Sequence, residues 1–263
     1  MKKYLFIFKS ELMSNLQYVF NYLVGFIGYL IHIFIFLNLW KYIYSDSSKL
    51  INGYSMNQMI WYVIITEILW SSLSGRNLCR KICNDVKSGN ITYNINRPYN
   101  YVGYILSNYL ADATIKGLIY LVLGLLLGFI FLGSMPDINI LSVIFVLISM
   151  ILATIISILL ITFIGLISFF IEDANPFYWI YSKLILIVGT LFPIEYFPEF
   201  IQPILKFSPV YVVCYGPARL FVNFNINEGI IILISQIIYI AFSFLICSLI
   251  YKKGVKKLNV NGG

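Results

Sequence analysis

Charged side chains are scarce in this sequence: Asp, Glu, Lys and Arg together make up 11% of its 263 residues. Soluble domains carry roughly 25% of these residues, so the deficit excludes a large soluble core. Hydrophobic residues reach 60%, and apolar runs of about twenty residues recur from end to end. Most of these runs are apolar on all sides, as helices in lipid are. The sequence therefore predicts an all-α membrane protein.

Residues that carry common enzymatic chemistry are also few. The only histidine is His32, and the four cysteines form no metal-ligand pattern with it. The sequence has no Gly-x-x-x-x-Gly-Lys-Ser/Thr loop to cradle ATP phosphates, no His-Glu-x-x-His motif and no Gly-x-Ser-x-Gly turn. We therefore expect no catalytic residue, no metal site and no cofactor bound by this chain. We interpret His32 as a helix-packing residue.

Six apolar spans are predicted, at residues 18–43, 57–75, 102–133, 139–171, 177–192 and 228–251. The first 16 residues mix apolar and charged side chains, which is typical of a helix lying in the membrane interface. No linker or low-complexity stretch separates a second domain. We therefore interpret residues 1–263 as one membrane domain.

Lysine and arginine cluster in three places: residues 2–9, residues 76–97 and residues 252–257. Loops that stay in the cytoplasm carry such an excess, so all three segments are expected on the cytoplasmic side. Both termini then face the cytoplasm, which fits an even number of spans. Because topology accounts for the net charge of +7, no nucleic-acid partner is expected.

Residues 76–98 form a basic segment between the second and third spans. Leu78, Ile82 and Val86 recur at helical spacing, which predicts a short amphipathic helix that ends near Gly89. Pro98 is expected in the first turn of the next element. The segment either docks a partner protein or is an ordinary basic surface helix. Its candidate contact residues are Arg76, Arg80, Lys81, Asp85, Lys87, Gly89, Arg97 and Pro98.

Residues 193–221 are apolar and aromatic but contain five prolines at short intervals, which forbid one straight helix. We expect short broken helices that re-enter the outer leaflet while packed against protein. The segment is either a hydrophobic outer loop or an outer gate that closes a translocation path. The prolines concerned are Pro193, Pro198, Pro203, Pro209 and Pro217.

Polar residues inside the spans are the remaining candidates. Glu67 lies near the middle of the second span, where an acid costs about 2.5–3.5 kcal/mol. It either lines a translocation path or is hydrogen-bonded as structural glue. Asp112 and Lys116 stand four residues apart on one helix face, as a neutralising pair does. Gly124 and Gly128 form a small-x-x-x-small pattern that favours close helix approach.

The order of these elements resembles that of permeases of the type 2 ABC exporters. Such permeases have an interfacial helix, two spans, a cytoplasmic coupling helix, three spans, re-entrant outer helices and a last span. Two local patterns are similar to a bacterial subfamily once described only as a domain of unknown function. They are Lys87-Ser88-Gly89-Asn90-Ile91 with Asn96-Arg97-Pro98, and the run Phe192-Pro193, Phe197-Pro198, Pro209, Gly216-Pro217. Asn96 departs from the subfamily, which has an apolar residue there.

The resemblance implies a function and a set of partners. Such permeases work as homodimers or heterodimers in the bacterial plasma membrane, surrounded by lipid. A separate pair of ABC ATPase subunits binds ATP and Mg, and the coupling helix, here about 76–88, rides in a groove on the ATPase.

Three alternatives remain open. They are an ion-driven secondary transporter, an integral-membrane enzyme and a non-transporting assembly subunit. A secondary transporter usually has interrupted helices in both halves, whereas only the second half is broken by proline here. The sequence indicates no substrate.

Overall fold

The computed structural model of the chain describes residues 2–44, 49–95, 97–136 and 139–261. Within these ranges the chain consists of helices and turns, with a single isolated bridge between Ile51 and Tyr54. The predicted all-α class is confirmed.

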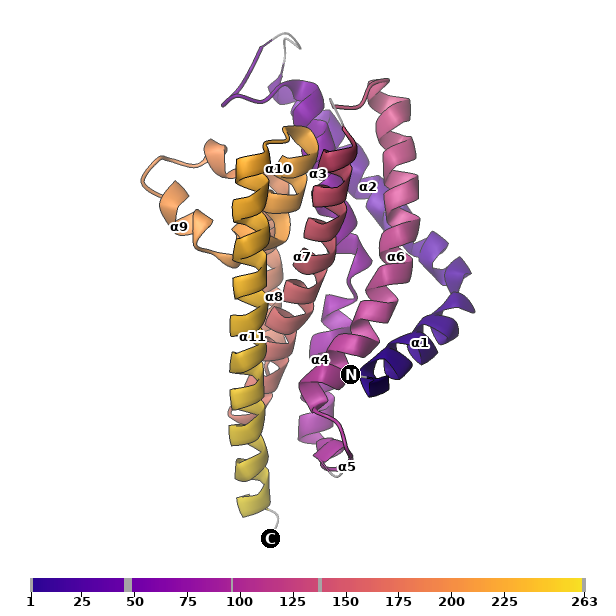
Figure 1. The fold of residues 1–263 in the computed structure, drawn as a ribbon, viewed down its shortest axis with the longest axis vertical. Coiled ribbons are helices and arrows are strands. Elements are labelled where there is room, and N and C mark those ends of the chain that lie inside the picture. Colours follow the sequence, from indigo (N-terminus) through magenta and orange to yellow (C-terminus); the bar gives the residue numbers. More distant parts are fainter. Residues whose placement is uncertain (1, 45–48, 96, 137–138, 262–263) are drawn as a thin grey trace.

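Four helices are long and apolar enough to cross a membrane. They run along the long axis of the molecule (Figure 1) and comprise α2 (Val19–Ile43), α6 (Tyr101–Leu132), α7 (Ile140–Leu166) and α11 (Ile226–Asn261). Two shorter helices stand among them: α3 (Met56–Ser72) and α8 (Asn175–Leu184), which continues as a π-helix over Ile185–Leu191. The chain is therefore a multi-pass membrane protein.

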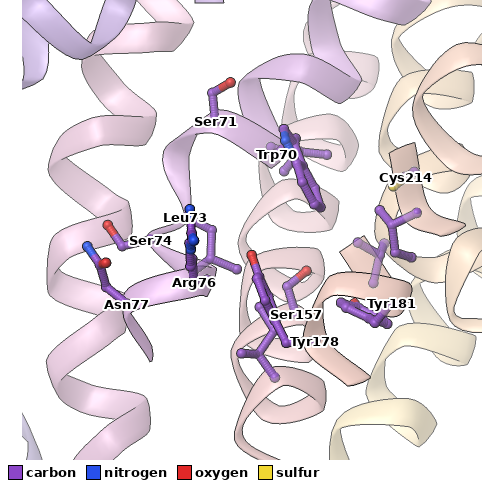
Figure 2. Close-up of a pocket in the computed structure, with 15 residues that line it drawn as sticks. Trp70, Ser71, Leu73, Ser74, Arg76, Asn77, Ser157, Tyr178, Tyr181 and Cys214 are labelled. Carbon is purple, nitrogen blue, oxygen red and sulfur yellow. The ribbon is translucent and has the colours of Figure 1, made fainter. Parts of the chain in front are cut away.

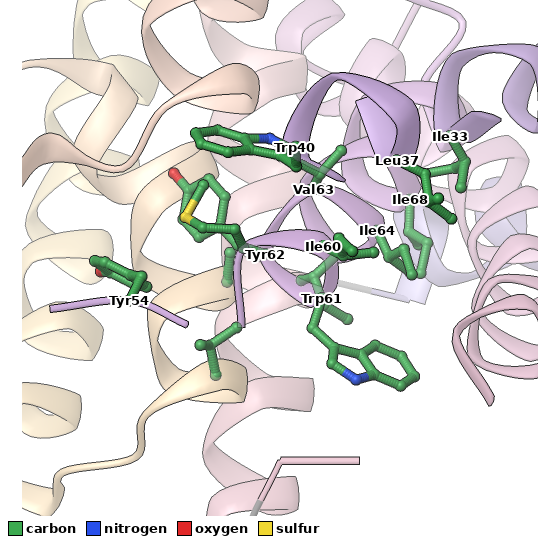
Figure 3. Packing of buried hydrophobic residues seen from close by; sticks show 14 of the residues in the cluster. Ile33, Leu37, Trp40, Tyr54, Ile60, Trp61, Tyr62, Val63, Ile64 and Ile68 are labelled. Atoms are coloured by element: carbon green, nitrogen blue, oxygen red, sulfur yellow. The ribbon is translucent and has the colours of Figure 1, made fainter. Parts of the chain in front are cut away.

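Helix α3 is the centre of the larger apolar cluster (Figure 3). Every side chain from Met59 to Ile68 is buried, because α2, α6 and α10 (Gly216–Val222) surround the helix. Two glycines of α6 allow this contact. A Cβ atom on Gly128 would lie 2.1 Å from the Trp61 ring, and one on Gly124 would lie 2.6 Å from the Tyr29 hydroxyl. The predicted close approach at these glycines is confirmed.

Helix α4 (Gly75–Lys87) packs across one end of the bundle, against α7 and α8 (Figure 1). Leu78, Ile82 and Val86 are buried as predicted, and they form the apolar face of α4 together with two buried cysteines. Gly165 of α7 meets this face so closely that a Cβ there would lie 2.9 Å from Ile82 Cβ. The helix stops before Gly89, whose φ of 74° is left-handed, and the short helix α5 (Ile91–Ile95) follows.

The prediction that Pro98 starts the next helix is wrong. Helix α6 begins at Tyr101, because the Asn100 side chain caps it by accepting hydrogen bonds from the backbone N–H groups of Val102 (2.8 Å) and Gly103 (3.3 Å). Pro98 lies before this cap, and its carbonyl accepts a hydrogen bond from the Lys3 ammonium.

Residues 193–221 are broken as predicted. A 3₁₀ turn (Ile194–Tyr196), α9 (Gln202–Lys206), a π-helix (Tyr211–Tyr215) and α10 follow one another. Pro203 and Pro217 lie in the first turns of α9 and α10. The backbone N–H groups of a first turn have no partner within the helix, so proline, which lacks this group, costs no hydrogen bond there. Pro193 and Pro198 flank the 3₁₀ turn, and Pro209 precedes the π-helix. Figure 1 shows α9 projecting from the bundle.

Helix α1 (Lys2–Leu16) lies obliquely against α6 and buries none of its residues (Figure 1). Its Tyr4 hydroxyl accepts a hydrogen bond of 2.9 Å from the Asn100 backbone N–H. Leu5 and Phe6 are 66% and 74% exposed. The start of α1 and the end of α11 lie toward the end of the bundle that carries α4 and α5 (Figure 1).

Candidate functional site

The outward face of α4 carries exposed positive charge. Arg76, Arg80 and Lys87 are exposed, and the Lys87 ammonium lies 3.8 Å from the Asp173 carboxylate in the α7–α8 loop. Both partners of this ion pair are almost half exposed, so it contributes little to stability. Hydrogen bonds from Asn175 hold the pKa of the Asp173 carboxyl below its ordinary value of 3.8. The Asp173 carboxylate is therefore ionised near neutral pH and faces the Lys87 ammonium.

Two other charged residues of α4 turn toward α6. The Lys81 ammonium lies 5.4 Å and 5.8 Å from the ring centres of Tyr104 and Tyr109. Asp85 accepts a hydrogen bond of 2.9 Å from the Tyr101 hydroxyl. These two side chains brace α4 against α6, so they are less available to a partner protein than Arg80 and Lys87.

The remaining loop residues named from the sequence lie around α5. Gly89 is in the turn before it, and Arg97 and Pro98 are exposed in the turn after it. Helix α5 lies at the same end of the bundle as α4 (Figure 1).

Glu67 is completely buried in α3, and its partner is the histidine of α2. One carboxylate oxygen lies 3.3 Å from His32 Nδ1 and 3.5 Å from the Ser71 hydroxyl. The other oxygen is buried and makes no hydrogen bond within the described part of the chain. The His32 side chain is 49% exposed in the middle of α2. Sequence reasoning missed this role of His32, because no local pattern links residues 35 positions apart.

Asp112 and Lys116 form the predicted ion pair, with 2.9 Å between the charged atoms. Tyr22 of α2 donates a hydrogen bond of 3.2 Å to Asp112, and the Lys116 ammonium donates to the Ser74 hydroxyl between α3 and α4. The pair therefore connects α2, α6 and the start of α4.

A cavity of about 240 Å³ opens where α3 turns into α4, beside α8 (Figure 2). Trp70, Tyr178 and Tyr181 give it aromatic walls, and Ser71 and Asn77 add polar groups. Arg76 is the charged residue in the described lining. Sequence reasoning placed Arg76 with the other basic residues and did not foresee a cavity, because the three walls come from distant parts of the chain.

The opposite end of the bundle carries a cluster of hydrogen-bonded side chains that we call the outer latch: Tyr54, Glu195, Tyr215, Arg219 and Glu228. Glu195 accepts hydrogen bonds from Tyr54 (3.1 Å) and Tyr215 (2.5 Å). Arg219 donates to the Tyr54 hydroxyl (3.1 Å) and to the Glu228 carboxylate (3.4 Å). The outer latch joins the loop after α2 to the broken segment and to the start of α11.

Two further tyrosines extend the outer latch. The Tyr44 and Tyr196 hydroxyls lie 2.9 Å apart, and Tyr44 also donates to the Tyr54 carbonyl at 2.7 Å. The predicted prolines set where the segment breaks into short helices. The hydrogen bonds of these polar side chains then connect those short helices to the rest of the bundle. No sequence motif predicted these hydrogen bonds.

The comparisons with known proteins agree with this architecture. The family described as "ABC-2 family transporter protein" matches residues 11–262, a range that includes all the site residues discussed above. No curated protein matches the chain. A chain of this family is the membrane permease of an ABC exporter, associated with an ABC ATPase and distinct from it. This protein therefore belongs to the ABC-2 family of transporter proteins.

Proposed function

We propose that this permease exports its substrate by docking α4 on a separate ABC ATPase pair, which binds ATP and Mg. The observation that carries the proposal is the two-sided character of α4. Its apolar face packs against α7, where Gly165 leaves no gap at Ile82, and its opposite face presents exposed Arg80 and Lys87. When a partner protein displaces the charged face of a helix that is packed in this way, the displacement is transmitted directly to the bundle.

The topology that supports this role has six crossings: α2, α3, α6, α7, α8 with its π-helical continuation, and α11. Both termini, α1 and α4 lie on the cytoplasmic side of the bacterial plasma membrane. The clustering of basic residues at the end that carries α4 favours this orientation. The exposed Leu5 and Phe6 suit an α1 that lies in the membrane interface.

A second permease completes the path. The half-exposed His32 supports this step, because a polar imidazole in the middle of a membrane helix faces protein or water rather than lipid. Glu67 and His32 then line a path between two copies of this chain or between two related chains. Asp112 and Lys116 brace the bundle, since they contact three of its elements.

The outer gate is the segment 193–221 together with the outer latch. Pro193, Pro198, Pro203, Pro209 and Pro217 fix the breaks between its short helices. When ATP closes the ATPase pair, motion of α4 tilts the bundle, the outer latch breaks and the path opens outward. Hydrogen bonds suit this step because small displacements make and break them.

The docking test is the double substitution Arg80→Glu with Lys87→Glu, scored by co-purification of the partner ATPase. We expect at least about a ten-fold loss of bound ATPase, because reversed charges repel the partner surface. The matched control is Lys252→Glu with Lys253→Glu, two exposed residues of α11. Undiminished ATPase binding by the first variant would refute the docking role of α4.

The alternative of an ion-driven secondary transporter has its own test. The chain is reconstituted in vesicles without an ATPase, and uptake is measured with an imposed proton or sodium gradient. We expect no gradient-driven uptake, and uptake under these conditions would favour the alternative.

A further inference from the structure

The cavity beside Arg76 combines an apolar wall with one charged side chain. Its deep wall is apolar, formed by Ile161, Ile185 and Val213. Its other side carries one guanidinium group, which within the described residues makes no ion pair and no side-chain hydrogen bond. In Figure 2, Arg76 lies on the left, Tyr181 and Cys214 lie on the right, and Tyr178 lies between them.

An unpaired arginine at an apolar cavity favours a ligand with a negative charge. The guanidinium group has five donors and matches phosphate or carboxylate oxygens. The nearest buried acid of α3, Glu67, is turned toward His32 and does not line the cavity. The charge of the cavity is therefore positive, and its walls suit hydrocarbon.

The position and volume of the cavity indicate which other groups the ligand carries. It lies where α3 ends at Ser72 and α4 begins at Gly75, which is the inner membrane boundary in the proposed topology. A volume of about 240 Å³ is below the 300–1,000 Å³ typical of drug-sized ligands, so it holds a head group and the first part of a chain.

We propose that this cavity binds an anionic amphiphile, with its phosphate or carboxylate head on Arg76 and its alkyl chain between α3, α8 and the π-helix after α8. Resting on the proposed function, this ligand class is the exported cargo. Arg76 is then a binding residue, whereas Arg80 and Lys87 face the ATPase.

Tryptophan fluorescence tests the binding, because Trp70 lines the cavity while Trp40 and Trp61 are buried elsewhere. The full chain with Trp179→Phe is reconstituted in phosphatidylcholine vesicles that contain a little brominated phosphatidylglycerol or brominated phosphatidylcholine. The Trp70 signal is the part lost in a further Trp70→Phe variant. We expect the anionic brominated lipid to quench this signal more strongly than the zwitterionic one.

Variants locate the head group. Arg76→Gln is expected to weaken the excess quenching about ten-fold, whereas Arg76→Lys keeps most of it and Arg80→Gln keeps all of it. Ser157→Leu, which fills the cavity and leaves the charge, should also remove it. Equal quenching by both lipids, or excess quenching that survives Arg76→Gln, overturns the proposal.

Competition separates the two sources of such a head group. Dodecyl phosphate is expected to relieve the excess quenching and inorganic phosphate to leave it unchanged, because the apolar wall requires a chain. Relief by inorganic phosphate overturns the amphiphile assignment.

A last experiment tests whether the bound amphiphile is the exported cargo, separately from whether the cavity binds it. In vesicles that contain the permease with its ATPase, addition of ATP and Mg should lower the excess quenching as cargo leaves. Unchanged quenching would overturn the assignment of the ligand as cargo, while the binding site would stand on the variant results.

Discussion

Both ends of this bundle have an apolar core, but the end opposite α4 also carries the hydrogen-bonded side chains of the outer latch. At the end with α4, buried Leu78, Ile82 and Val86 pack on α7, and each such side chain contributes roughly 1.5–3 kcal/mol. At the opposite end, the outer latch consists of hydrogen bonds that contribute about 0.5–1.5 kcal/mol each. Apolar packing is tight and hard to deform, whereas hydrogen bonds break over small displacements. In the proposed function, the packed face of α4 transmits motion and the outer latch opens.

The largest loss of stability is expected from a substitution that disturbs the packing between α4 and α7. Gly165→Ala places a Cβ 2.9 Å from Ile82 Cβ, an atom next to the backbone that cannot rotate away. We expect a loss of about 1–3 kcal/mol in unfolding free energy, measured by denaturant titration in detergent. In the control Gly117→Ala the new Cβ meets Ser72 at 3.7 Å, an ordinary contact. Equal stability of both variants would show that α4 is loosely held.

The next test removes the cation from the outer latch. Arg219→Gln leaves the Glu228 carboxylate without its ion pair and should destabilise the segment 193–221 by about 1–2 kcal/mol. Hydrogen exchange in this segment should then quicken about ten-fold while α4 keeps its protection. Lys206→Gln, an exposed residue of α9, makes the same change of charge and is expected to alter neither. Faster exchange in α4 as well would contradict the separation of the two ends.

Glu67→Gln sharpens the comparison between the two ends, since Glu67 lies between them. The amide keeps a polar partner for His32 and Ser71 and cannot carry a negative charge, so we expect a stability change below about 1 kcal/mol. Export by the complex with the ATPase should fall several-fold if the pair lines the path. A variant with unchanged export and unchanged assembly would refute both the path role and the structural role of Glu67.

The smallest effect is expected at the exposed ion pair of α4. The pKa of Asp173 lies below 3.8 in the folded protein, so its contribution to stability is fully present above about pH 4 and is lost as the pH falls through the lowered pKa. Asp173→Asn should therefore lower the melting temperature slightly at pH 6 and not at all at the acidic limit. A melting difference that persists in acid would exclude the carboxylate as its cause.

Some features of the site could be predicted because their signals are local. The basic helix at 76–88, its stop at Gly89 and the breaks at five prolines follow from residues a few positions apart. The Asp112–Lys116 pair follows from one helical turn. The predicted span at 102–133 agrees with α6 to within one residue, but Pro98 does not lie in the first turn of that helix, because Asn100 caps it.

Other features depended on which helix faces meet. Lys81 and Arg80 are neighbours with the same charge, yet Lys81 lies over tyrosines of α6 and Arg80 is exposed. The partner of Glu67 is 35 residues away, and Tyr54 bonds to Glu195 across 141 residues. No spacing rule reaches across such distances.

The sequence by itself determined the solvent and the helices, because the transfer of long apolar runs into lipid and the backbone limits of proline and glycine act within each segment. Only the tertiary structure decided how polar side chains are shared between helices. In a lipid environment a buried polar group needs a partner, and the packing of the bundle determined that Glu67 meets His32. The same packing placed Glu195 beside two tyrosines and the exposed Arg76 at the mouth of a cavity.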